Sequence, residues 1–184
     1  LLVTTFNDPL YQARLVPELK HLKKRVDVIK FDTLCASICK KRLGKWNEPQ
    51  SVRGLVMHMA ELFPEVNDWG IDFLCDEFTW IKEAGRTRRE DYVNQPRDGR
   101  GGEGGRTLSR EQKGILFDLF EKYESELNEI PATDWAGMHD KTYKYLEEGV
   151  KPEKKYDVIL IDEAQHFAPV WMKIISHFLK PEGL

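Results

Sequence analysis

Three short apolar runs, rich in β-branched residues, constrain the fold of this chain more than any other feature. Two of them open the sequence, at Leu1–Phe6 and Val26–Phe31, and the third, Val158–Ile161, lies near its end. Polar and apolar residues do not alternate regularly within the runs, which is typical of parallel strands buried on both faces. Helical patterns follow all three runs, so the outer parts of the chain predict an α/β layer.

The stretch between these outer parts is predicted to be helical. Residues 46–150 show no convincing strand pattern, whereas apolar residues recur there at helical spacing and capping-box sequences begin at Thr87 and Ser109. The sequence therefore predicts two domains. Residues 1–45 and 151–184 form a partial parallel-sheet domain, and residues 46–150 form an all-helical insertion.

Composition excludes several classes of protein. No apolar run approaches the roughly 18 residues of a membrane helix, so we expect no membrane association. The 28 basic and 31 acidic residues give a net charge of −3, which argues against a uniformly basic coat protein but not against a local basic patch. Three cysteines do not suit a disulfide framework and favour a reducing, cytoplasmic setting. Because the first residues read as a strand without a leader, we expect an excised piece of a longer protein.

The most specific chemical signal follows the third apolar run. Val158–Ile161 leads directly into Asp162 and Glu163, and Ala164 and Gln165 come next. A buried parallel strand would deliver these carboxylates to the carboxyl edge of the sheet, where open α/β sheets bind ligands. Two adjacent acids can divide the work of nucleotide hydrolysis, since one holds Mg²⁺ and the other polarises the attacking water. The alternative is a strand end that simply meets solvent through two acids.

Arginines concentrate around a glycine-rich stretch. Seven of the 11 arginines lie between Arg86 and Arg110, and Gly99–Gly105 contains five glycines. Such a loop can wrap a phosphate backbone, because glycine allows close approach and guanidinium pairs with phosphate in a fork. The alternative is a solvated helix face with a mobile tip.

Five segments together resemble one enzyme family, the UvrD/Rep-type DNA helicases of superfamily 1. The run Asp162-Glu163-Ala164-Gln165 resembles motif II of these helicases. Residues 2–7 resemble motif Ia and residues 30–34 resemble the motif after it, both of which line the single-stranded DNA path in the family. Parts of 92–110 resemble the helical insertion called 1B, and residues 133–135 resemble the segment that closes it. The order and the spacing agree over essentially the whole chain.

The resemblance implies a fragment of an ATP-dependent DNA helicase or translocase, with a partial RecA-like (P-loop NTPase) domain and a 1B-like insertion. In the nucleotide site, Asp162 would hold Mg²⁺, Glu163 would act as general base, and Gln165 would couple the γ-phosphate of ATP to DNA. The implied partners are single-stranded DNA and the rest of the helicase chain. Phe6 and Phe31 are expected at exposed loop positions. The implied nucleic-acid contacts are Thr5, Phe6, Asn7, Phe31, Thr33, Arg97, Arg100, Arg106 and Arg110.

The chain departs from the family pattern at three places. His166 follows Gln165 where Asp is common, and Asp32 stands where His is usual. The sequence also contains no Gly-x-x-x-x-Gly-Lys-Ser/Thr phosphate loop, which in the family precedes motif Ia. We therefore expect the chain alone to bind ATP–Mg²⁺ negligibly and to hydrolyse none. A sheet without its phosphate-loop strand would leave an apolar edge, which favours self-association.

Two other functional classes stay open on the sequence. One is a non-catalytic nucleic-acid-binding module that kept the helicase fold without unwinding. The other is a helical interaction domain whose acidic strand end has no catalytic role.

Overall fold

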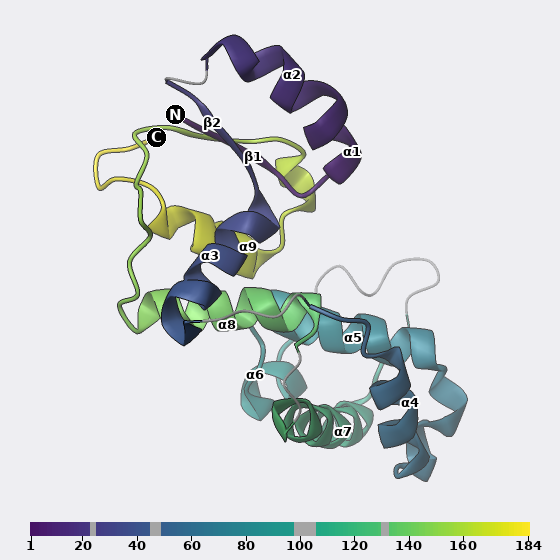
Figure 1. The fold of residues 1–184 in the computed structure, drawn as a ribbon. Helices are drawn as coiled ribbons and strands as arrows, with labels where there is room; N and C mark the ends of the chain where they lie inside the picture. Colours follow the sequence, from purple (N-terminus) through teal and green to yellow (C-terminus); the bar gives the residue numbers. More distant parts are fainter. Residues whose placement is uncertain (23–24, 45–48, 98–105, 130–132) are drawn as a thin grey trace. The chain divides into compact units, whose positions relative to one another are not determined.

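A computed structural model of the chain describes residues 1–22, 25–44, 49–97, 106–129 and 133–184 (Figure 1). The chain divides into two compact units. The α/β unit comprises Leu1–Trp46 and Met138–Leu184, and the helical unit comprises Asn47–Gly137. The first boundary lies next to the predicted one, but the second lies earlier than the predicted residue 150. Most of the last helix of the predicted insertion therefore belongs to the α/β unit.

The sheet of the α/β unit consists, in its described residues, of parallel strands in the order β2-β1-β3. The strands are β1 (Leu2–Thr5), β2 (Asp27–Lys30) and β3 (Ile159–Ile161). Each predicted run therefore forms a strand, and the prediction of an α/β architecture with a parallel layer is confirmed. Burial on both faces holds for the central strand β1 alone, since Leu160 in the edge strand β3 is 52 % exposed. Self-association through such an edge stays a prediction.

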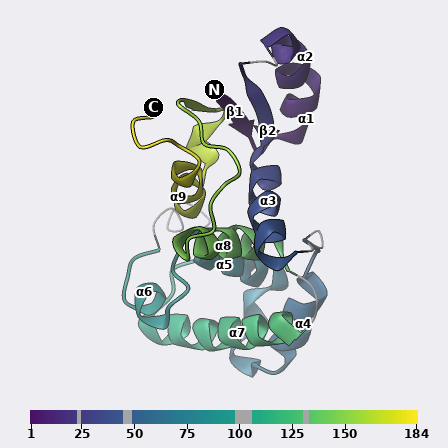
Figure 2. The ribbon, with the colours of Figure 1, turned by 60° about the vertical axis from the view of Figure 1, so that its left-hand side comes forward.

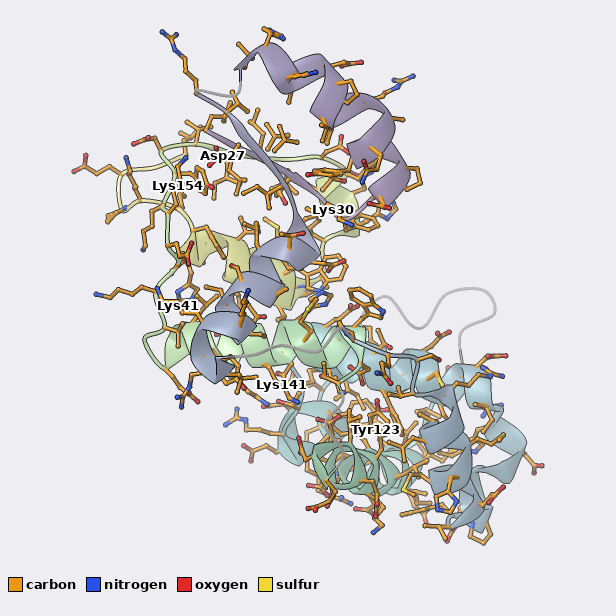
Figure 3. All side chains as sticks on the ribbon, in the orientation of Figure 1. Asp27, Lys30, Lys41, Tyr123, Lys141 and Lys154 are labelled. Atoms are coloured by element: carbon orange, nitrogen blue, oxygen red, sulfur yellow. The ribbon has the colours of Figure 1, made fainter. Side chains whose placement is uncertain are left out.

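Ion pairs secure both ends of β2. At its carboxyl end Lys30 Nζ lies 2.9 Å from Asp8 Oδ1, in the helix that follows β1. At its amino end Asp27 Oδ2 accepts hydrogen bonds from Lys154 Nζ (2.6 Å) and from the Tyr156 hydroxyl (2.7 Å). Figure 3 shows Lys30 and the Asp27–Lys154 pair at opposite ends of the strand. These contacts tie an edge strand to segments on either side of it in the sequence.

A helical stretch follows β1 and runs to Leu22. It consists of α1 (Asp8–Leu10), a π-helical turn (Tyr11–Leu15), α2 (Val16–Leu19) and a 3₁₀ turn (Lys20–Leu22). The π turn comes just before Pro17, which lies in the first turn of α2. Because proline has no backbone N–H, Pro17 cannot donate an α-helical hydrogen bond. The wider π turn before it accommodates this missing bond, and the helical stretch continues as α2.

Besides a 3₁₀ turn (Ala164–His166), the described part of the α/β unit contains three more α-helices, which pack together beside the sheet (Figure 2). They are α3 (Phe31–Leu43), α8 (Trp135–Glu147) and α9 (Pro169–His177). Met138 and Leu146 of α8 are buried in the same core as Leu2 of β1 and Ile174 of α9. Burial of these apolar residues explains why α8 belongs largely to this unit rather than to the insertion.

The helical unit contains no strand among its described residues, as predicted. Its helices are α4 (Arg53–Glu61), a 3₁₀ segment (Pro64–Trp69), α5 (Ile71–Glu83), α6 (Arg89–Val93) and α7 (Arg110–Glu129). The capping box at Ser109 is confirmed, because Gln112 N–H donates to Ser109 Oγ and Ser109 N–H donates to Gln112 Oε1. The one predicted at Thr87 is wrong, since α6 begins only at Arg89. None of the described helices has the length and apolar character that a bilayer crossing requires.

Candidate functional site

The segments that follow the three strands converge at one edge of the sheet. All three strands are parallel, so their carboxyl ends lie together. Thr4 of β1 pairs with Ile161 of β3, and the next residue, Asp162, donates its backbone N–H to the Thr4 carbonyl over 3.0 Å. The predicted motif Ia, the motif after it and motif II therefore meet at the edge where open α/β sheets bind ligands.

Asp162 and Glu163 form the turn directly after β3. One carboxylate oxygen of Asp162, Oδ2, is shielded from solvent and has no hydrogen-bond partner among the described residues. Glu163 adopts a left-handed backbone conformation with φ 55°, the only positive φ outside glycine in the described residues. Such a conformation costs of order 1–3 kcal/mol. A buried carboxylate oxygen beside a strained, exposed acid is an arrangement that suits the binding of a cation.

The two residues after Ala164 interact with Glu163 rather than with the sheet. Gln165 Nε2 donates a hydrogen bond to Glu163 Oε2, and His166 Nε2 lies 3.8 Å from the same oxygen. All three side chains are exposed. The unusual His166 therefore stands close enough to form an ion pair with Glu163 when the imidazole is protonated.

Thr5 and Asn7 shape the turn after β1. The buried Thr5 Oγ1 accepts a hydrogen bond from Asn7 N–H over 3.0 Å, and Asn7 Oδ1 accepts one from Leu10 N–H over 3.1 Å. Asn7 is thus the N-cap of α1. Both polar groups already have structural partners, and their contact with DNA stays a prediction.

The two aromatic candidates are less accessible than predicted. Phe31 is completely buried as the first residue of α3 and stacks on Trp171, with ring centroids 5.0 Å apart. The expectation of an exposed position is wrong for Phe31, because α3 begins there and directs this residue into the core. Phe6 is partly buried, and its ring contacts His166 and Phe167 at centroid distances of 6.1 and 6.2 Å. Thr33 is exposed on the first turn of α3.

Asp32, the second departure from the family pattern, has a partner that sequence reasoning missed. His139 Nε2 lies 2.9 Å from Asp32 Oδ1, and the His139 side chain is almost fully buried. Its ring also packs on Trp171 at 4.9 Å between centroids. The two residues lie 107 positions apart, so no local pattern could have paired them.

The predicted arginine contacts divide into different environments. Arg97 is 7 % exposed and forms a two-pronged ion pair with the completely buried Glu77, which also accepts a hydrogen bond from the Tyr92 hydroxyl. Burial would lower the pKa of Arg97, but the Glu77 carboxylate outweighs that effect and raises it. Arg106 and Arg110 are exposed. Arg100 lies outside the described residues. Arg97 is therefore a buried structural ion pair rather than an exposed phosphate contact.

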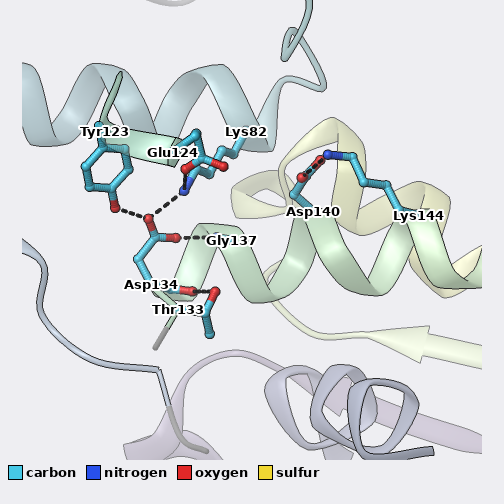
Figure 4. A network of polar contacts seen from close by, with 8 residues as sticks. All are labelled: Lys82, Tyr123, Glu124, Thr133, Asp134, Gly137, Asp140 and Lys144. Carbon is cyan, nitrogen blue, oxygen red and sulfur yellow. Dashed lines mark hydrogen bonds and ion pairs between the residues drawn. The ribbon is translucent and has the colours of Figure 1, made fainter. Parts of the chain in front are cut away.

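A second buried network in the helical unit surrounds Lys82, and its members lie on α5, α7 and the turn before α8 (Figure 4). Lys82 Nζ lies 2.6 Å from both Asp134 Oδ2 and Glu124 Oε1, although the Lys82 side chain is only 1 % exposed. Asp134 also accepts hydrogen bonds from the Tyr123 hydroxyl and from Gly137 N–H. The sequence drew attention to residues 133–135 through the resemblance, but not to Lys82.

These contacts shift the pKa values of Asp134 and Tyr123 in opposite directions. Burial alone would raise the pKa of the Asp134 carboxyl, but the Lys82 ammonium and the three hydrogen bonds outweigh burial and lower it. Burial and the adjacent Asp134 raise the pKa of Tyr123 well above its usual range. Asp134 is therefore ionised and Tyr123 protonated at neutral pH.

Comparison with known proteins identifies no relative, since neither a protein family model nor a curated protein sequence matches the chain.

Within the described ranges, no group of three or more His, Cys, Asp or Glu side chains is arranged to hold a metal ion.

Proposed function

We propose that this chain is part of an ATP-dependent DNA helicase or translocase with a RecA-like core. The observation that carries the proposal is the position of Asp162 and Glu163 directly after β3, where the backbone N–H of Asp162 donates a hydrogen bond to Thr4 of the central strand β1. This is the edge at which parallel α/β sheets bind their ligands. The resemblance of five segments to superfamily 1 helicases is the reason for interpreting these two acids as part of a nucleotide site.

The residues present fit the nucleotide site that the resemblance implies. The unpartnered Oδ2 of Asp162 offers a hard oxygen for Mg²⁺ or for a water bound to it. Glu163 is exposed and would accept a proton from the attacking water, while Gln165 holds its carboxylate through a hydrogen bond. When bound, Mg²⁺–ATP would supply the phosphoryl group that is transferred. We expect the chain by itself to be inactive, because its sequence contains no phosphate loop to cradle the nucleotide.

Replacing Asp162 by asparagine is expected to weaken Mg²⁺-dependent ATP binding by the intact protein about 10- to 100-fold, because a charged ligand becomes neutral. Titration with a fluorescent ATP analogue, in Mg²⁺ and in EDTA, measures the effect. Asp157→Asn is the matched control, since Asp157 is exposed and lies before β3 rather than after it. Equal binding by the Asp162→Asn variant and the natural protein would show that Asp162 holds no metal.

Single-strand binding is expected to be weak and sensitive to salt. Replacing both Arg106 and Arg110 by alanine should lower the log–log salt slope by about 1.4, at roughly 0.7 for each lost phosphate contact. Fluorescence anisotropy with an oligothymidylate at several salt concentrations measures it, with the exposed Arg14→Ala as control. An unchanged slope would leave the two arginines as ordinary surface residues. Arg97→Ala should instead lower stability, because it removes the guanidinium that pairs with the buried Glu77 carboxylate.

A further inference from the structure

The helical unit contains a cavity of about 320 Å³ that the proposed helicase function does not use. Its wall comes from α4, α5 and α7 and from the residues that begin α8. Phe78, Tyr123, Asp134 and Trp135 line it together with Val56 and Ala136. The volume lies at the lower end of the range for small-molecule sites, about 300–1,000 Å³. The lining combines aromatic rings, short aliphatic groups, the Arg53 guanidinium and two carboxyl side chains, Asp134 and Glu83.

The charge beside this cavity is negative. Among the described residues, Lys82 is the one cation in contact with Asp134 and Glu124, so these three side chains together carry one negative charge. Tyr123 adds no charge, because its raised pKa keeps the hydroxyl protonated. Arg53, at the cavity wall, is neutralised by its ion pair with Asp72. A cation in the cavity would therefore gain electrostatic energy that an anion would lose.

The aromatic rings provide a second attraction for a cation. Trp135 is 51 % exposed although it is one of the largest apolar side chains, whereas Phe78 is buried and contributes only its inner face. The unit already binds a cation in this manner, since Lys82 Nζ lies 5.0 Å from the centroid of the Tyr123 ring. Cations are attracted to the faces of Trp and Tyr within about 6 Å.

We propose that this cavity binds the ammonium end of a short alkylamine, with Trp135 facing the cation and the aliphatic wall enclosing its hydrocarbon body. The same chemistry is presented by a free amine and by the side chain of a lysine in a peptide. The proposal does not depend on the helicase function, because none of these residues belongs to the carboxyl edge of the sheet.

Isothermal titration of the full chain with three probes tests the proposal. The probes are n-butylammonium, the uncharged 1-butanol of similar shape, and lysine blocked at both its amino and carboxyl groups. Butylammonium is expected to bind at least about 10-fold more tightly than butanol, since only the cation gains from the negative wall. Tighter binding of blocked lysine than of butylammonium assigns the site to a peptide, and weaker binding assigns it to a free amine; either ranking supports the proposal.

Three variants distinguish a loss of ligand binding from a loss of folding. Trp135→Leu keeps an apolar group at a half-exposed position and is expected to weaken butylammonium binding about 2- to 30-fold. Glu124→Gln removes the excess charge but keeps the Lys82–Asp134 pair, and should weaken binding at least about threefold. Glu121→Gln is the control, because Glu121 is an exposed acid of the same helix outside the cavity wall. Thermal melts establish that each variant is folded. Equal affinity for butanol and butylammonium, or unaltered affinity in folded Trp135→Leu, would overturn the proposal.

Discussion

Replacing Glu163 by glutamine is expected to lower DNA-stimulated phosphate release by the intact protein about 10²- to 10⁴-fold while ATP remains bound. Glutamine keeps the shape of the side chain and removes the group that takes the proton from water. The proposed metal ligand, Asp162, is untouched, so Mg²⁺-dependent ATP affinity should stay close to that of the natural protein. Loss of turnover without loss of binding identifies a base rather than a binding residue.

The measurement is phosphate release with saturating single-stranded DNA, accompanied by nucleotide binding on the same samples. Glu153→Gln serves as the matched control, because Glu153 is an exposed acid that precedes β3. The left-handed backbone at residue 163 should cost the same with glutamine as with glutamate, because the steric penalty comes from the Cβ that both residues have. Normal hydrolysis by the Glu163→Gln variant would mean that the two acids only end a strand, and the proposed function would be wrong.

Replacing Lys82 by methionine is expected to lower the free energy of unfolding of the helical unit by about 3–5 kcal/mol. The substitution leaves Asp134 and Glu124 close together without the ammonium that both carboxylates contact. Methionine has a similar length, so the lost stability reflects the missing charge more than a cavity. Urea denaturation followed by circular dichroism measures the effect, and the exposed Lys122→Met, which breaks only a surface pair with Glu126, should cost about 0–1 kcal/mol.

The pH dependence of the stability of Lys82→Met distinguishes the loss of the ammonium charge from a loss of packing. In the natural protein the pKa of Asp134 lies below its ordinary value of 3.8, so the stability it contributes is present above pH 3.8 and is lost as pH falls through the lower value. Without Lys82, burial dominates and raises the pKa of Asp134 above that of the unfolded chain. The variant should therefore recover part of its stability as pH falls toward 4. A constant difference between the two proteins across this range would contradict the role assigned to Lys82.

Local chemistry explains which elements the sequence predicts correctly. The three strands are runs whose β-branched and apolar residues suit a buried sheet, and the cap at Ser109 needs only Gln112. Each of these features depends on neighbours within a few residues. The position of Asp162 and Glu163 at the carboxyl edge follows in the same way, because they come directly after a strand.

The sequence by itself therefore determined the α/β layer, the helical middle and the edge that carries the acids. Only the tertiary structure decided that Arg97 is buried against Glu77, that Asp32 pairs with His139, and that Lys82 joins two carboxylates. Each of these pairs joins residues 20 or more positions apart, among them 107 for Asp32 and His139. Whether a charged side chain meets water or a buried partner depends on how amphipathic helices pack, and that packing minimises exposed apolar area over the whole unit rather than along the local chain.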